Sequence, residues 1–232
     1  MLLSGGVSNP STLTIQKKFA AAVEVEQSYM LNEARVVSAI AIQPVDKTVI
    51  GLIISHTGFT GYTASGVSVV LGRALGNVRL GTEFTFQHAM MTGNETSGSI
   101  NAGISCRLQL SSVFNTGFRI RNIGGLFSKN ENFYAPVVQA AAGYDVSESV
   151  HMGCEWMQEP GRSPVVVTGL LYQFHRLFIA TFGMAWTPCQ PYGGFQLQQH
   201  KWKLLMKTSF HPVLGWSPAV GISFGHINND KQ

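Results

Sequence analysis

The stretch that decides the fold is His175–Pro188, HRLFIATFGMAWTP. Apolar residues, the largest side chains among them, occupy every second position, at Phe178, Ala180, Phe182, Met184 and Trp186. The intervening residues are Leu177, Ile179, Thr181, Gly183 and Ala185, which are smaller, with some aliphatics among them. A period of two is typical of a β-strand whose two faces meet different surroundings. The stretch therefore predicts a strand that presents its bulkiest apolar residues to one side.

The same alternation recurs along almost the whole chain. We count about 14 such segments, each near the roughly 9–11 residues that a tilted strand needs to cross a bilayer. They cover residues 17–31, 34–43, 48–56, 63–73, 77–89, 98–110, 112–122, 134–145, 149–157, 164–174, 177–187, 192–198, 201–210 and 216–226. One face of these segments is apolar throughout. The other carries polar, charged or very small residues.

Composition indicates which solvent surrounds the apolar face. Of the 232 residues only 12% are charged, about half the usual share of a soluble domain, while 45% are hydrophobic and 25 are Gly. No run of about 18 apolar residues is uninterrupted, so the sequence predicts no transmembrane helix. A strand protein that turns alternate residues towards lipid satisfies both observations. We therefore predict an all-β fold, a transmembrane antiparallel up-and-down β-barrel of about 14 strands.

A water-soluble β-sandwich is the alternative, because its antiparallel sheets alternate too. It would carry Lys, Glu and Thr on an outer face and large aliphatics within. The second face here holds Gly, Ala, Ser, Asn, Arg and Glu, which suits a crowded polar lumen. Aromatic residues also gather near segment ends, where the interfacial girdles of membrane barrels lie. Both features favour the barrel.

The connections between segments predict the orientation. Those after even-numbered segments are tight, such as PVDK and RALGN, whereas most of the others are longer, such as HTGFTGYT and AMMTGNETSG. Outer-membrane barrels have short periplasmic turns and longer outside loops. This parity predicts a bacterial outer-membrane location with both termini periplasmic. The start, MLLSGGVSNPST, lacks a basic stretch followed by a long apolar core, so we expect no signal peptide in it.

Three stretches resemble a known family. SNPSTLTIQ (Ser8 to Gln16), GLIISHTGFTGYTASGVSVVLGRAL (Gly51 to Leu75) and HPVLGWSPAVGISF (His211 to Phe224) are similar to the long-chain fatty-acid transporter (FadL-like) superfamily, particularly its PorV/PorQ-like Bacteroidota branch. The resemblance spans nearly the whole chain through diffuse strand patterns. It implies a 14-stranded outer-membrane barrel, some relatives being solute transporters and others accessory subunits of the type IX protein-secretion translocon.

The length of the chain favours an accessory subunit over a solute transporter. About 16 residues precede the first segment, which leaves no room for the larger hatch and long loops of the superfamily's transporters. We expect residues 1–16 to form a periplasmic or plug segment in which Asn9 and Pro10 enter the lumen, 17–226 the barrel and 227–232 a periplasmic tail. The leading hypothesis is a non-enzymatic accessory or scaffold subunit of an outer-membrane machine, for type IX-like secretion or for barrel assembly. The alternative is a transporter of a small hydrophobic solute.

Charged residues of the second face form the candidate site. We expect them to build a paired, hydrated network, because an unpaired buried charge costs several kcal/mol. Such a network either fills and rigidifies the barrel, which we favour, or lines a conduction path. Its members are Glu24, Glu26, Arg79, Glu83, Arg107, Arg119, Arg121, Asp145, Glu155, Lys203 and Lys207.

The remaining expectations concern partners and chemistry. Loop aromatics are the candidate contacts with other outer-membrane proteins or lipoproteins, namely Phe59, Tyr62, Phe127, Phe133, Tyr134 and Trp216. The wall itself would meet lipid and lipopolysaccharide (LPS). Scattered Lys and Arg argue against nucleic-acid binding. The G-x-S-x-G match around Ser223 lies inside an alternating strand, and His151 and Cys154 would face opposite sides, so we expect no catalytic residue, metal or cofactor.

Overall fold

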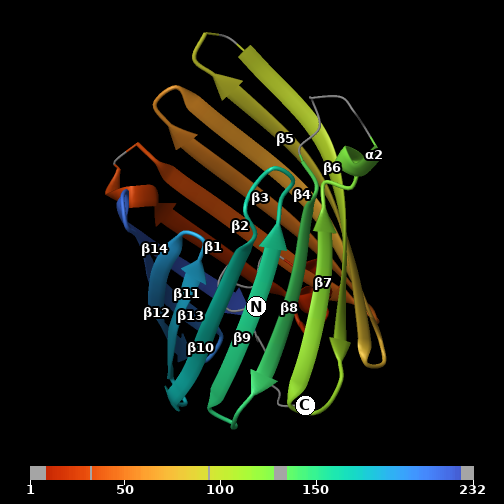
Figure 1. Ribbon diagram of the computed structural model, residues 1–232. Coiled ribbons are helices and arrows are strands. Elements are labelled where there is room, and N and C mark those ends of the chain that lie inside the picture. Colours follow the sequence, from red (N-terminus) through yellow and green to blue (C-terminus); the bar gives the residue numbers. More distant parts are fainter. Residues whose placement is uncertain (1–8, 32, 94, 128–134, 226–232) are drawn as a thin grey trace.

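Fourteen antiparallel strands make up most of the chain in the computed structural model, which describes residues 9–31, 33–93, 95–127 and 135–225. Each strand pairs with its neighbours in sequence, and β1 pairs with β14 to close a barrel (Figure 1). The strands are β1 (Ala20–Gln27), β2 (Arg35–Val45), β3 (Thr48–Phe59), β4 (Tyr62–Leu75), β5 (Val78–Met91), β6 (Glu95–Gln109), β7 (Phe114–Arg121), β8 (Val137–Asp145), β9 (Val150–Gln158), β10 (Val165–His175), β11 (Phe178–Trp186), β12 (Cys189–Gln199), β13 (Trp202–His211) and β14 (Gly215–Gly225). The predicted 14-stranded up-and-down barrel is confirmed.

The short helical segments are α1 (Pro10–Leu13), α2 (Gly124–Phe127) and the 3₁₀ turn η1 (Ser28–Met30). Among the described residues, no helix has the length and apolar character needed to cross a membrane.

The outer wall is apolar, as the alternation predicts. In β11 the exposed residues are Phe178, Phe182 and Trp186, with 41%, 51% and 56% of their surfaces accessible, whereas Ile179 is buried on the inner side. A ring of exposed large apolar side chains on every strand is unfavourable in water and favourable in hydrocarbon. Closure supplies the other requirement of a bilayer, because every strand has a hydrogen-bonded partner on both edges.

The strands end at other residues than predicted, and most of the longer loops predicted at one end of the barrel are short turns between longer strands. β3 continues to Phe59 and β4 begins at Tyr62, so the connection predicted over 56–63 is a turn at Thr60 and Gly61, where Gly61 has a φ of 89°. The stretch predicted as a loop over 89–98 is also largely strand. The reason is that alternation persists past the apolar belt with polar side chains, such as His56 opposite Ser65, and a strand accommodates them outside hydrocarbon.

Strand length varies around the barrel. β4 and β5 have 14 residues and β6 has 15, whereas β1 and β7 have only 8. Figure 1 shows the consequence: the β5–β6 hairpin, in yellow, projects well beyond the green and blue strands of the opposite wall. The helix α2, which follows β7, lies at this same end.

The inner wall is not uniformly polar, which corrects a second expectation. On β2 to β4 the inward residues Ile40, Ile42, Val49 and Val70 are buried and cluster with Leu13 of α1. The inner surface of these strands is apolar because a segment of the same chain covers it. The sequence pattern could not reveal this cover.

Candidate functional site: the lumen

The N-terminal segment enters the lumen and docks on one wall. Asn9 caps α1: its side chain accepts a hydrogen bond from the backbone N–H of Ser11 at 3.0 Å, and Pro10 occupies the first turn. The same N–H lies 3.1 Å from the hydroxyl oxygen of Ser105 in β6. Ser11 is completely buried. Asn9 and Pro10, the two residues predicted for the plug, therefore form the start of α1, inside the lumen and against the barrel wall.

Glycines of β4 and β5 provide the space for this contact. A Cβ atom on Gly81 would stand 2.5 Å from the backbone nitrogen of Ser11 and 2.6 Å from the carbonyl carbon of Pro10. A Cβ atom on Gly72 would stand 2.9 Å from the carbonyl oxygen of Pro10. Real Cβ atoms do not approach other atoms so closely, so the backbone of α1 lies directly on bare strand backbone.

A buried ion pair on the inner face of the barrel joins β5 to β7 across the intervening strand β6. Arg119 of β7 donates to the carboxylate of Glu83 in β5 at 2.5 Å, and 6% and 7% of these residues are exposed. The Glu83 side chain lies flat over Gly103 of β6, where a Cβ would stand 2.6 Å from its carboxylate oxygen. This geometry brings together two of the predicted network residues from strands that are not adjacent.

Three other charged residues of the predicted network that carry a carboxylate each have a polar partner: Glu24, Asp145 and Glu155. Lys207 of β13 donates to Glu24 of β1 at 2.6 Å across the intervening strand β14. Glu155 accepts from the amide of Gln139 at 3.2 Å, and Asp145 is paired with the ring of His151. His151 was overlooked as a network member because its H-x-x-C spacing drew attention to metals. Its alternation with outward Met152 would have identified it.

The rest of the predicted network is not joined to a carboxylate. Arg79, Arg107, Arg121 and Lys203 face inwards, but none forms an ion pair with another described side chain. The inward Glu26 likewise forms no ion pair within the described residues. Among the described residues, the lumen therefore holds separate charge pairs and several cations that belong to no ion pair, instead of one continuous network.

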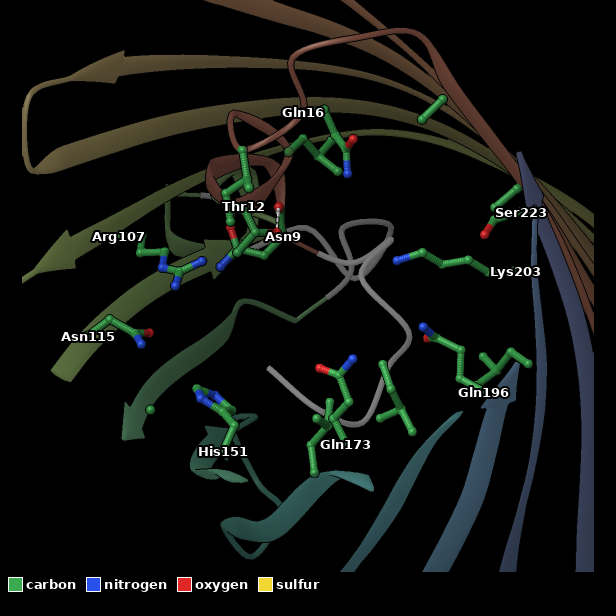
Figure 2. A pocket seen from close by; sticks show the side chains of 18 of the residues that line it. Asn9, Thr12, Gln16, Arg107, Asn115, His151, Gln173, Gln196, Lys203 and Ser223 are labelled. Carbon is green, nitrogen blue, oxygen red and sulfur yellow. Dashed lines mark hydrogen bonds between the residues drawn. The ribbon is translucent and has the colours of Figure 1, made fainter. Parts of the chain in front are cut away.

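A cavity of about 1010 Å³ occupies the half of the lumen where β1 begins and β14 ends. Its lining comes from α1, β1, β2, the strands from β6 to β14 and the β8–β9 turn. Figure 2 shows Asn9, Thr12 and Gln16 along one edge, with Arg107 and Lys203 extending into the space from opposite walls. His151 and Gln173 close the far side. Inward Ile40, Ile179 and Leu205 add apolar surface.

The candidate partner contacts are not loop residues where they are described. Phe59 and Tyr62 are a cross-strand pair at the tip of β3 and β4, with ring centroids 5.3 Å apart. Trp216 lies on the outer wall in β14 and packs against Phe210. Phe127 ends α2, and nothing is established for its side chain. Phe133 and Tyr134 lie outside the described residues.

The structure also gives the positions of Ser223, His151 and Cys154, the three residues considered in the sequence analysis for catalysis or metal binding. Ser223 lies within β14 and lines the cavity. His151 lines the cavity as well, whereas Cys154, three residues later, is exposed. In the described ranges, no group of three His, Cys, Asp or Glu side chains has the proximity needed to hold a metal ion.

Neither a protein-family model nor a curated protein matches the sequence. Solved structures do match the fold. CymD, a monoaromatic hydrocarbon channel, aligns with a TM-score of 0.69 at 8% identity over 94% of this chain and 91% of its own. The Acinetobacter baumannii outer membrane protein Omp33 aligns with 0.59 at 7% identity, over 91% and 99%. A mutant Rhodopseudomonas blastica porin aligns with 0.52 at 8%, over 89% and 98%. At these identities the likeness establishes a shared barrel fold, while membership of the FadL-like superfamily stays a prediction.

Proposed function

We propose that the protein is an outer-membrane channel whose lumen admits small solutes. The observation that supports this most directly is the cavity of about 1010 Å³ inside a closed barrel with an apolar outer wall. Small-molecule sites have volumes of about 300–1,000 Å³, so the space is sufficient for a solute. The fold is shared with a hydrocarbon channel and a porin, which supports the same role. The role is non-enzymatic and requires no cofactor.

The proposed orientation places both termini in the periplasm. At the end where β1 begins, the connections are short, such as residues 46–47, 76–77 and 200–201. The opposite end carries α2 and the projecting β5–β6 hairpin. Short periplasmic turns and larger outside elements are typical of outer-membrane barrels. The cavity would then open towards the periplasm, and α1 would restrict the passage from within.

Reconstitution tests the channel function. The purified barrel is placed in liposomes, and uptake of small neutral and charged organic solutes is compared with that of protein-free vesicles. We expect uptake of solutes below the cavity volume and conductance in planar bilayers. Folding is verified independently from β-sheet circular dichroism and from the shift in electrophoretic mobility on heating. A folded, inserted barrel that passes neither ions nor solutes would rule out the proposal.

The accessory role expected from the resemblance stays a prediction. No feature of the described wall distinguishes a surface for a protein partner from one for lipid, since both are apolar. Purification from native membranes in mild detergent decides between the roles. A stoichiometric outer-membrane partner or lipoprotein would support the accessory role, and a lone barrel with measurable flux would support the channel.

A further inference from the structure

We infer that the cavity is a binding site for small organic anions, with Lys203 and Arg107 as the groups that hold the negative charge. This inference deepens the proposed function, because it names the class of solute that the lumen would take. It depends on two cations that face the cavity and form no ion pair with another described side chain, and on the apolar surface around them.

Lys203 is the stronger of the two observations. It lies on the inner face of β13, and only 7% of its surface is exposed. Its ammonium group points into the cavity in Figure 2, and it forms no hydrogen bond or ion pair with another described residue. A buried ammonium group without a partner is costly, because it has lost most of its hydration. An anion in the cavity would supply the missing charge.

Arg107 supplies a second cation from the opposite wall. It faces the cavity from β6, and its buried Nε has no hydrogen-bond partner among the described residues. Arg79 of β5 stands directly across from it in the strand register. Like charges in this position repel each other. A carboxylate bound at Arg107 would relieve the repulsion and could accept two parallel N–H donors from the guanidinium group.

Among the described residues, the carboxylates that line the cavity are Glu24, Asp145 and Glu148. Glu24 is paired with Lys207, whereas Asp145, paired with the ring of His151, also attracts Arg107. Glu148 lies in the exposed β8–β9 turn at the mouth, where water screens its charge. Within the described wall, Lys203 is therefore the cation that none of these carboxylates offsets.

The surrounding wall determines what else the ligand must be. Ala22, Ile40, Ile179, Leu171 and Leu205 present apolar surface to the cavity. An inorganic anion would leave this surface in contact with trapped water. A carboxylate attached to a compact aromatic or aliphatic body would use both the cations and the apolar wall. Small organic carboxylates are the class that fits.

Calorimetry on the intact barrel in detergent tests the inference with three probes of one shape. Benzoate is the anion, benzamide the neutral analogue and benzylamine the cation. We expect benzoate to bind at least about tenfold more tightly than benzamide, and benzylamine to show no binding. Equal affinity for benzoate and benzamide, or no binding of benzoate, would overturn the inference.

Variants assign the effect to the two residues. Lys203→Met and Arg107→Met should each weaken benzoate binding at least about tenfold and leave benzamide unchanged, whereas Lys203→Arg should keep most of the affinity. Lys201→Met is the matched control, because it removes the same charge two residues away in an exposed turn that does not line the cavity. Benzoate affinity that survives both cavity substitutions in folded protein would contradict the assignment.

The outcome is separable from that of the channel proposal. Benzoate binding without flux would leave the anion site standing and reject the channel. Flux without preference for benzoate would leave the channel standing and reject the anion site.

Discussion

Glu83 and Arg119 form the most deeply buried ion pair between described side chains. We predict that Glu83→Gln lowers the free energy of unfolding by about 3–5 kcal/mol, because it leaves the Arg119 guanidinium buried without a counter-charge. Urea unfolding in lipid vesicles measures the difference. The double variant Glu83→Gln/Arg119→Met should recover much of the loss. A Glu83→Gln barrel within about 0.5 kcal/mol of the parent would show that water reaches Arg119.

At this residue scale, the sequence predicted which face a charge occupies but not which charge it meets. Alternation places Glu83 and Lys207 on the inner wall because the period of a strand is fixed. Pairing depends on tilt and register around the whole ring, and these brought Glu83 to Arg119 two strands away and left Lys203 alone. The same limit applies to His151: alternation places it on the inner wall, but its partner Asp145 belongs to the neighbouring strand β8.

The element that lies inside the lumen is α1, and it docks where glycines of β4 and β5 leave the strand backbone uncovered. We predict that Gly81→Val displaces α1, since the added Cβ would overlap Ser11 and Pro10. Single-channel conductance should rise, and trypsin should cut more rapidly after Lys17 or Lys18. Gly98→Val is the control: in β6 a Cβ would meet no described heavy atom within 4 Å. Unchanged conductance and proteolysis in a folded Gly81→Val barrel would show that α1 does not restrict the pore.

Element boundaries were the least predictable part of the fold. The strand cores emerged from alternation, but β3 to β6 run further than the apolar belt because polar residues continue the same period. A polar strand end and a polar loop have similar compositions, so sequence alone does not separate them. The apolar inner surface at Ile40 and Val70 was unpredictable for another reason, since its cover, Leu13, lies far away in sequence.

At the scale of the whole molecule, the apolar outer face and the closure of the sheet follow from a single cause. Hydrocarbon outside the wall requires both an apolar face on every strand and a partner for every backbone edge, and a closed ring satisfies both. The low share of charged residues and the alternation of apolar residues were sufficient to predict a closed membrane barrel, without any local sequence motif. These requirements do not determine which end of the barrel faces the periplasm. That orientation depends on the turns and loops at the two ends of the barrel.

Cysteine labelling in intact cells tests the orientation. In a background with Cys106, Cys154 and Cys189 replaced by Ser, we predict that Thr92→Cys, in the projecting β5–β6 turn, reacts with a membrane-impermeant maleimide. Lys47→Cys, in the exposed β2–β3 turn at the opposite end, should react only after the outer membrane is permeabilised. Both turns are exposed, so the difference reports sidedness and not burial. The reverse pattern would place the termini outside the cell and would open the cavity, with Lys203 and Arg107, to the medium.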